Sequence, residues 1–404
     1  MPAEESAPDS FDLECSLRAP AMPAHLYIHV PFCRSKCSYC DFYSITGATD
    51  DLTEVYRRGV EAELVRWADA ALPGLLDSVY VGGGTPSAFA HLPELLDAVM
   101  RRFDLHPTAE VTIEANPGTV TPALLKRLAR AGVTRVSLGV QTLAAGELAL
   151  LGRTHTREQV LEACSQVLDA GLDLSVDLMC GIPGQMLNSW ISTLEAVIDA
   201  GARHVSVYPL SLEEGTPLAV ACEGGLVPEP DSDLAASMML AAEEVLTAAG
   251  LPRYEVANYA VPGHESRHNL AYWTGRNYIG IGPSAHSMFD AQTARAVGLL
   301  PLHSGGSVAR VRIAEPADID EWLTSGEVET EYLDADQVAR EDIMLGLRLT
   351  RGVAESQVEA AALTAVLESL AGQGLVELVE SHWRTTRRGW LLGNEVFGRV
   401  WAGE

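Results

Sequence analysis

The sequence contains six short runs of apolar, mostly β-branched residues, and each is followed by a stretch with the spacing of an amphipathic helix. Strands that alternate with helices form βαβ units, and repeated βαβ units build a parallel sheet. Glycine follows several helical stretches, as at Gly132, Gly171 and Gly201, where it supplies the left-handed helix cap. The repeats therefore predict an α/β protein, built either as an open doubly wound sheet or as a partial barrel. The expected strands are 26–30, 78–81, 110–114, 135–139, 174–178 and 205–209, and the expected helices are 52–71, 92–103, 121–131, 157–170 and 189–200.

The same patterns divide the chain into four parts. Residues 1–24 are rich in Pro, Ala and acidic residues without periodicity, which is typical of a mobile tail. The βα repeats occupy residues 25–215. The alternation weakens over residues 216–334, which we interpret as an extension of the repeated fold. Residues 335–404 predict a small helical domain with a two-stranded wing over 375–380 and 383–386.

The charge balance excludes several classes of function. The chain has 28 Lys and Arg residues against 55 Asp and Glu residues, which gives a net charge of −27. Nucleic acid is therefore not an expected partner, because phosphate binding needs a basic surface. No apolar run approaches the roughly 20 residues of a membrane span. The first residues also lack the basic and apolar segments of a secretory signal. We expect a cytoplasmic protein without stable membrane insertion.

Three of the seven cysteines lie close together in the segment Cys33-Arg-Ser-Lys-Cys37-Ser-Tyr-Cys40, directly after the first expected strand. In a chain without an export signal, such clustering indicates a metal centre rather than disulfides. Structural zinc usually takes four protein ligands, often as two separate pairs, and this segment has no second pair. Three thiolates suit a 4Fe-4S cluster with one iron open to another ligand. A zinc site completed by a distant His or Cys is the alternative.

This spacing after the first strand of a βα series resembles the radical S-adenosylmethionine (SAM) superfamily. The resemblance implies a partial (β/α)6 barrel of the TIM type, with a 4Fe-4S cluster held by Cys33, Cys37 and Cys40. It also implies that SAM binds the open iron, where an electron from the cluster cleaves it to methionine and a 5′-deoxyadenosyl radical. The spacing by itself indicates only a three-thiolate site.

Polar residues stand at the C-terminal ends of later strands, where parallel α/β folds gather their site residues. Glu114, Gln141 and Asp177 interrupt apolar runs in this way, and the second strand is followed by a Gly-Gly-Gly-Thr-Pro element at 82–86. Each feature alone is equally well explained as a cap, a turn or a surface ion pair. Together they resemble the oxygen-independent coproporphyrinogen III oxidase group of the superfamily. The resemblance implies SAM contacts from Tyr27, Tyr39, Gly83, Gly84, Thr85, Glu114, Gln141, Arg153 and Asp177, with Ser211 as a weaker match.

Two features distinguish the oxidase from a related group. In the oxidase a second cysteine follows the triad as C-x-C, whereas this chain has Asp41 and Phe42 after Cys40. Residues 268–273 read His-Asn-Leu-Ala-Tyr-Trp, which fits the H-N-x-x-Y-W element of the HemW group of heme chaperones. Imidazole can ligate heme iron and aromatic rings pack on porphyrin faces. His268 is therefore the candidate axial ligand and His286 the second candidate, unless the element only caps a helix and fills a core.

The resemblance predicts a heme chaperone that binds heme, a 4Fe-4S cluster and SAM, and that delivers heme to hemoproteins such as respiratory enzymes. The alternative is an oxygen-independent coproporphyrinogen III oxidase, which is a radical SAM oxidative decarboxylase. Whether the chain is an enzyme and whether it forms a homodimer are left open. Cys164, Cys180 and Cys222 are scattered, and we interpret them as small buried apolar residues.

Overall fold

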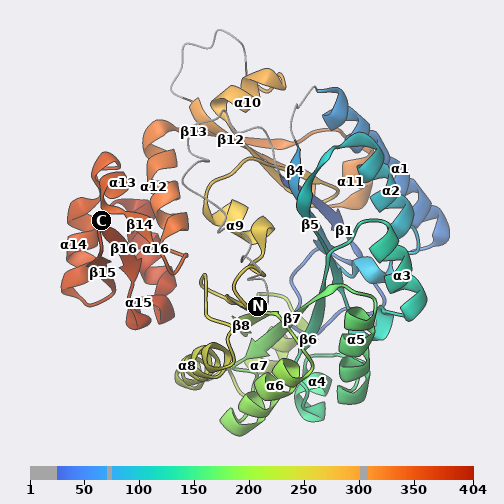
Figure 1. Ribbon diagram of the computed structural model, residues 1–404, viewed down its shortest axis with the longest axis horizontal. Helices are drawn as coiled ribbons and strands as arrows, with labels where there is room; N and C mark the ends of the chain where they lie inside the picture. Colours follow the sequence, from blue (N-terminus) through green and yellow to red (C-terminus); the bar gives the residue numbers. More distant parts are fainter. Residues whose placement is uncertain (1–24, 71–74, 301–307) are drawn as a thin grey trace, which may run out of the picture.

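A long, mostly parallel sheet curves around the centre of the molecule as a partial barrel (Figure 1). The computed structural model describes residues 25–70, 75–300 and 308–404, so the tail predicted for residues 1–24 lies outside the described residues. The predicted α/β class with a parallel sheet is confirmed, and each of the six expected strands falls within an observed one. These parallel strands are β1 (His25–Val30), β4 (Leu76–Gly83), β5 (Leu105–Ala115), β6 (Arg135–Gln141), β7 (Asp173–Cys180) and β8 (His204–Pro209).

Helices cover the convex face of this sheet (Figure 1). They are α1 (Asp50–Asp69), α2 (Leu92–Arg102), α3 (Pro122–Arg130), α4 (Ala145–Leu150), α5 (Arg157–Asp169) and α6 (Leu187–Asp199). Three of them begin where a threonine side chain accepts a hydrogen bond from a backbone N–H of the first turn: Thr49 for α1, Thr121 for α3 and Thr156 for α5. Such a cap satisfies one of the donors that a helix start leaves unpaired.

Each parallel strand alternates between aliphatic and polar residues. In β1, Leu26, Ile28 and Val30 are fully buried in the main hydrophobic core, while His25, Tyr27 and His29 occupy the other face. The period of two along a strand places these sets on opposite sides of the sheet. Closed barrels of this type fill their interior with branched aliphatic residues. Here the concave face is polar instead, so its side chains are able to bind a ligand.

Residues 216–334 extend the sheet at both edges. Strand β10 (Tyr278–Ile281) pairs in parallel with β1, and β11 (His286–Asp290), β12 (Val308–Ala314) and β13 (Glu329–Asp334) follow it as antiparallel neighbours. Strand β9 (Asn258–Ala260) pairs antiparallel with β8 at the other edge. Helix α9 (Arg267–Trp273) lies within the curve of the sheet (Figure 1). The remaining elements here are α7 (Pro217–Glu223), α8 (Ser232–Ala248), α10 (Ala291–Ala296) and α11 (Ile319–Thr324).

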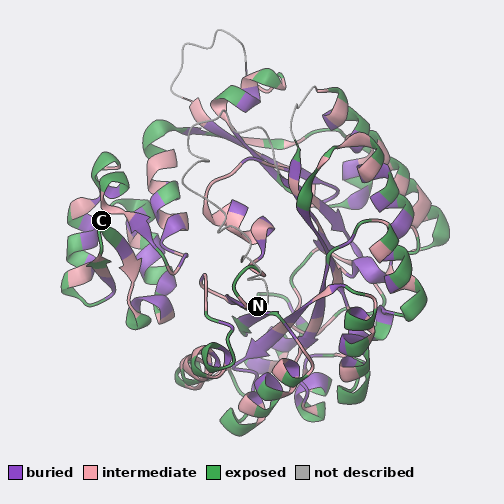
Figure 2. Cartoon of the chain, viewed as in Figure 1, coloured by how far each residue is buried: buried purple, intermediate pink, exposed green. Residues whose placement is uncertain are grey.

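The C-terminal residues form a helical unit with its own hydrophobic core, visible as buried inner faces in Figure 2. The predicted hairpin is confirmed, because β15 (Val376–Val379) pairs antiparallel with β16 (His382–Thr385), which also pairs with β14 (Val353–Ala354). The helices are α12 (Ala335–Gly346), α13 (Glu355–Ala360), α14 (Thr364–Gly372), α15 (Arg387–Leu391) and α16 (Gly393–Ala402). Across the described ranges, no helix combines the length and apolar character that a membrane crossing requires.

Candidate functional site

The three clustered cysteines lie on a loop at the C-terminal end of the parallel strands. Cys33 ends the short strand β2 (Phe32–Cys33), which pairs with β3 (Ile45–Thr46), and Cys37 and Cys40 follow in the turn. Backbone hydrogen bonds anchor this loop on both sides: the Ser38 N–H donates to the Leu151 carbonyl at 3.1 Å, and the Leu218 N–H donates to the Ser38 carbonyl at 2.8 Å. All three cysteines are partly exposed. The loop is therefore held in place while its thiols stay accessible.

A guanidinium lies directly beside the thiols. Nη1 of Arg153 is 3.3 Å from Sγ of Cys37, and Nη2 donates to the Gly139 carbonyl. Nε of Arg153 is buried without a hydrogen-bond partner, so this side chain keeps a donor free. Burial raises the pKa of the Cys33 and Cys40 thiols. Iron binding at this loop therefore has to displace protons, as is usual for thiolate ligation.

The thiol geometry bears on which metal centre the loop fits. In the part of the chain that the structure describes, no three His, Cys, Asp or Glu side chains are grouped around one point. In a 4Fe-4S cluster each thiolate binds a different iron of the cube. Three thiols on one loop, with a cation beside them, therefore suit such a cluster with one iron left open.

The glycine-rich end of β4 packs tightly against the strand that leads into the cysteine loop. Gly83 has a φ of +109°, and a Cβ there would lie 2.7 Å from the His29 ring. A Cβ on Gly84 would lie 2.9 Å from the Phe32 carbonyl oxygen. Only glycine permits this approach. The approach also brings the Thr85 hydroxyl to 3.4 Å from Sγ of Cys33.

Two partly buried carboxyls, Glu114 at the end of β5 and Asp177 on β7, lie on either side of β6 on the polar face of the sheet. Glu114 accepts hydrogen bonds from the Tyr80 hydroxyl at 2.8 Å and from the Gly83 N–H at 3.0 Å. Burial raises its pKa to about 7, and the charge of Asp177 adds to the effect. Asp177 accepts a bond from the Ser137 hydroxyl at 3.0 Å, and burial raises its pKa too. Carboxyl groups with strongly raised pKa values in a concave site indicate a binding or catalytic role.

The other predicted SAM contacts lie around these carboxyls. Gln141 at the end of β6 has a φ of +66°, a conformation that costs energy in a residue other than glycine and that gathers at functional sites. The Tyr27 ring stacks on Tyr80 with centroids 6.2 Å apart. Tyr39 packs against a small apolar cluster below the cysteine loop. The weaker match Ser211 is exposed just past β8.

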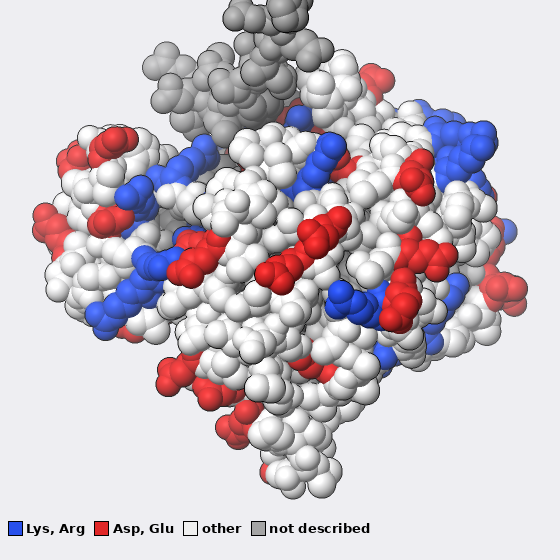
Figure 3. Space-filling model, turned by 60° about the horizontal axis from the view of Figure 1, so that its bottom comes forward, with Lys and Arg blue, Asp and Glu red and all other residues white. Residues whose placement is uncertain are grey.

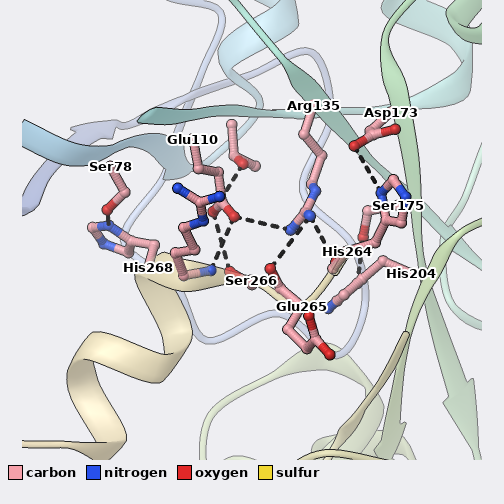
Figure 4. Close-up of polar contacts among 12 residues, drawn as sticks. Ser78, Glu110, Arg135, Asp173, Ser175, His204, His264, Glu265, Ser266 and His268 are labelled. Carbon is pink, nitrogen blue, oxygen red and sulfur yellow. Dashed lines mark hydrogen bonds and ion pairs between the residues drawn. The ribbon is translucent and has the colours of Figure 1, made fainter. Parts of the chain in front are cut away.

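A buried polar network deeper in the barrel was not predicted from the sequence (Figure 4). Glu110 and Arg135 form an ion pair at 3.2 Å, and the Arg267 N–H donates to Glu110 at 2.9 Å. Nη2 of Arg135 donates to the His264 carbonyl at 2.7 Å. These bonds tie the start of α9 to the floor of the barrel. The alternation of polar and aliphatic residues along each strand is the signal that could have revealed them.

His268, the candidate axial heme ligand, lies in the interior of the protein, and its role as a ligand stays a prediction. Only 1% of this residue is exposed. Its Nδ1 lies 2.8 Å from the Ser78 hydroxyl, and its Nε2 lies 2.9 Å from the Tyr272 hydroxyl (Figure 4 shows the Ser78 contact). Both ring nitrogens are thus engaged inside the protein. Iron could bind His268 only if one of these buried hydrogen bonds were broken.

A cavity of about 630 Å³ opens between the barrel, the β10–β12 sheet and helix α12. It touches the predicted SAM site, because Tyr27, Gly83 and Glu114 form part of its wall. Aromatic residues of the H-N-x-x-Y-W segment form another part. The remaining wall comes from the sheet extension and α12, and the lining includes Asp41, Phe42, Tyr272, Trp273, Tyr278, His286, Met288, Arg312 and Glu341.

Comparison with known proteins agrees with this architecture. Residues 27–197 match the radical SAM superfamily, and residues 333–392 match the HemN C-terminal domain. The Mycobacterium tuberculosis protein named heme chaperone HemW is 34% identical over 388 residues, which cover 93% of this chain and 94% of that protein. The Bacillus subtilis protein of the same name is 32% identical over 385 residues, covering 92% and 97%. A Bos taurus relative, radical S-adenosyl methionine domain-containing protein 1, mitochondrial, is 36% identical, covering 89% and 75%.

Among solved structures, the coproporphyrinogen III oxidase HemN from Escherichia coli aligns with a TM-score of 0.76 over 96% of this chain and 92% of that one. The two sequences are 21% identical, so this likeness establishes the shared fold and no more. The two relatives named heme chaperone HemW are closer in sequence and match over 94% and 97% of their length. The chain belongs to the HemW family of the radical SAM superfamily.

Proposed function

We propose that this protein is a heme chaperone that delivers heme to hemoproteins such as respiratory enzymes. The observation that carries the proposal is the shared wall of two sites. Tyr27, Gly83 and Glu114 belong both to the predicted SAM site and to the neighbouring cavity. The cavity volume of about 630 Å³ lies within the range of roughly 300–1,000 Å³ that is usual for sites of large organic ligands. The relatives named heme chaperone HemW, similar along nearly the whole chain, support the same conclusion.

Cys33, Cys37 and Cys40 would hold a 4Fe-4S cluster, and the residues around them would hold SAM. Arg153 can pair with a carboxylate through its fork of N–H donors. Glu114 and Asp177 can accept hydrogen bonds from ribose hydroxyls or an amine. Tyr39, Gly84, Thr85 and Gln141 complete this proposed set. When bound, a cluster with an open iron would provide one-electron chemistry next to this proposed SAM site.

The oxidase alternative is less well supported. The residues after Cys40 are Asp41 and Phe42, where the oxidase group has a second cysteine, and both line the cavity. Phe42 is 69% exposed, so its ring is available beside the cavity. An aromatic ring beside the cavity suits contact with a flat porphyrin face. We therefore assign the cavity to heme as cargo, and not to a substrate for decarboxylation.

Surface charge supports the remaining parts of the proposal. On the face shown in Figure 3, acidic and basic side chains are interspersed, and the whole chain carries a net charge of −27. We infer that the chaperone works in the cytoplasm, with hemoproteins rather than nucleic acid as partners, and without stable membrane insertion. We also propose that the protein forms a homodimer, and light scattering would test this assembly.

Two measurements on anaerobically reconstituted protein test this function. Incubation with coproporphyrinogen III, SAM and a reductant should yield no protoporphyrinogen. Incubation of the heme-loaded protein with an apo-hemoprotein should transfer heme and restore the activity of the acceptor. Free hemin at the same concentration is the control for passive transfer. Robust protoporphyrinogen formation would replace the chaperone with the oxidase, and transfer no faster than from free hemin would remove the delivery role.

A further inference from the structure

The cavity described above contains a histidine whose ring is free. His286 begins β11, is exposed, and forms part of the cavity wall. Within the described residues, neither of its ring nitrogens has a hydrogen-bond partner. Although one side of the ring is exposed, partial desolvation by its neighbours and the charge of Arg312 lower the pKa of His286 despite the opposing charge of Glu329, so the imidazole is mainly neutral near pH 7. Neutral imidazole is the form that ligates iron.

His268 lacks both the exposure and the unengaged ring nitrogens of His286. It lies behind the cavity wall, with Nδ1 against Ser78 and Nε2 against the Tyr272 hydroxyl. The Tyr80 ring stacks on its ring with centroids 5.2 Å apart. Tyr272 itself lines the cavity. The bond from His268 therefore holds a cavity-lining tyrosine in place, which is the task of a positioning residue.

The sheet around His286 gives the cavity a face suited to a flat anionic ligand. Met288 pairs with Tyr278 on one side and with Arg312 on the other, so these three side chains stand next to one another on one face. His286 lies two residues before Met288 on the same strand and shares that face. The face thus offers an imidazole, a thioether and an aromatic ring around one guanidinium.

Arg312 is suited to a carboxylate of the ligand. Among the described residues that line the cavity, it is the only Lys or Arg. Its Nη1 lies 2.9 Å from Glu341 of α12 and its Nη2 lies 3.0 Å from Glu331. Its Nε is buried without a partner. The Glu331 side chain is 55% exposed, so an entering carboxylate can replace it on Nη2, while Glu341 keeps its second ion pair with Arg310 at 2.5 Å.

We propose that His286 ligates the iron of heme in this cavity, that Arg312 pairs with a heme propionate, and that His268 acts only by positioning Tyr272. This inference rests on the proposed heme-binding function, and it assigns that function to a different histidine from the one in the H-N-x-x-Y-W element. Heme is a planar iron porphyrin with two carboxylates, which is the ligand chemistry that this face can recognise.

The test is hemin titration of the full-length protein, followed by Soret absorption and by EPR of the ferric complex. His286→Ala should weaken hemin binding by about tenfold or more and change the spectrum, and added imidazole should restore the wild-type spectrum. His268→Gln, which retains a hydrogen-bonding group toward Tyr272, should keep the wild-type spectrum. Arg312→Ala should weaken binding without changing the spectrum. His382→Ala, an exposed histidine of the C-terminal wing, is the matched control and should have no effect.

The outcomes separate this inference from the function on which it rests. If wild-type protein binds no hemin, the proposed heme-binding function fails, and the inference fails with it. If the wild type binds hemin and His286→Ala keeps its affinity and spectrum, the inference is overturned and the function stands. The same holds if His268→Gln loses the ligation signature while His286→Ala keeps it. Thermal unfolding of each variant before titration ensures that a lost spectrum reflects a lost ligand and not a lost fold.

Discussion

Nη1 of Arg153 lies 3.3 Å from Sγ of Cys37, although 116 positions separate the two residues in the sequence. The contact joins the cysteine loop to the segment after β6, and the second Nη of the same guanidinium holds the Gly139 carbonyl. One side chain thus reaches both the proposed cluster and the strand ends of the proposed SAM site.

The first prediction concerns this arginine. Arg153→Ala should lower SAM affinity by about 10- to 100-fold, because it removes a charge-assisted hydrogen bond to the carboxylate of the ligand. Arg153→Lys should restore only part of the affinity, since an ammonium lacks the planar fork. Calorimetric titration of cluster-loaded protein measures the effect. Arg157→Ala, an exposed arginine at the start of α5, is the control. Equal SAM affinity in Arg153→Ala and wild type would remove Arg153 from the site.

The second prediction concerns the metal centre. Alanine at Cys33, Cys37 or Cys40 should abolish stable cluster binding, because each thiolate is expected to hold a separate iron. Cys164→Ala, at a fully buried position of α5, should retain the wild-type iron content. Iron and sulfide analysis after anaerobic reconstitution checks this, with about four irons per chain expected for the wild type. A zinc-loaded wild type, or a Cys37→Ala protein with full iron content, would contradict the assignment.

The third prediction concerns the ion pair in the floor of the barrel. Glu110 and Arg135 have side chains only 6% and 7% exposed, and Glu110 also accepts the Arg267 N–H. Glu110→Ala should lower the free energy of unfolding by about 3–5 kcal/mol, because it leaves a buried guanidinium without its partner. Urea denaturation measures the loss.

The exposed pair Glu94 and Arg127 provides the comparison. Glu94→Ala should change the unfolding free energy by less than about 1 kcal/mol, because solvent screens a surface pair. If Glu110→Ala and Glu94→Ala lower the free energy of unfolding equally, the buried ion pair stabilises the fold no more than the exposed pair does.

The buried polar network around Glu110 and Arg135 shows what a local sequence pattern can predict and what it cannot. The six strands and the end positions of Glu114, Gln141 and Asp177 follow from short runs and from the rule that parallel strands carry site residues at their carboxyl ends. Treating each run as apolar overlooks residues such as Ser78 and Glu110, which alternate with the aliphatic residues at a period of two. A parallel strand with that alternation has one polar face, which in a barrel is the lumen.

The position of α9 could not be predicted in the same way. Ser78 and His268 lie 2.8 Å apart but 190 positions apart in the sequence. No local period encodes such a contact. The sequence resemblance identified residues 268–273 as important, but whether a histidine there faces a ligand or the interior depends on how the helix enters the barrel. The division at residues 215 and 334 likewise remains a prediction.

The last prediction concerns pH and a buried carboxyl outside the proposed site. Glu255 is 0% exposed, its Oε2 accepts the Ala257 N–H at 3.2 Å, and its Oε1 has no partner. Burial raises its pKa from 4.5 to about 7 in the folded protein. The folded state therefore binds the proton more tightly than the unfolded state does. The stability that this proton provides is fully present below about pH 4.5 and is lost as pH rises through about 7.

Glu255→Gln keeps the shape of the neutral side chain without its ionisation. The variant should therefore exceed the wild type in unfolding free energy by on the order of 1–3 kcal/mol near pH 8, and the difference should close near pH 5. Comparing the two proteins at each pH removes the contributions of Glu63 and Glu114, whose pKa values burial also raises to about 7. Glu368→Gln, at an exposed position of α14, should follow the wild type at both pH values. A constant difference between Glu255→Gln and wild type across this range would show that Glu255 does not change its protonation there.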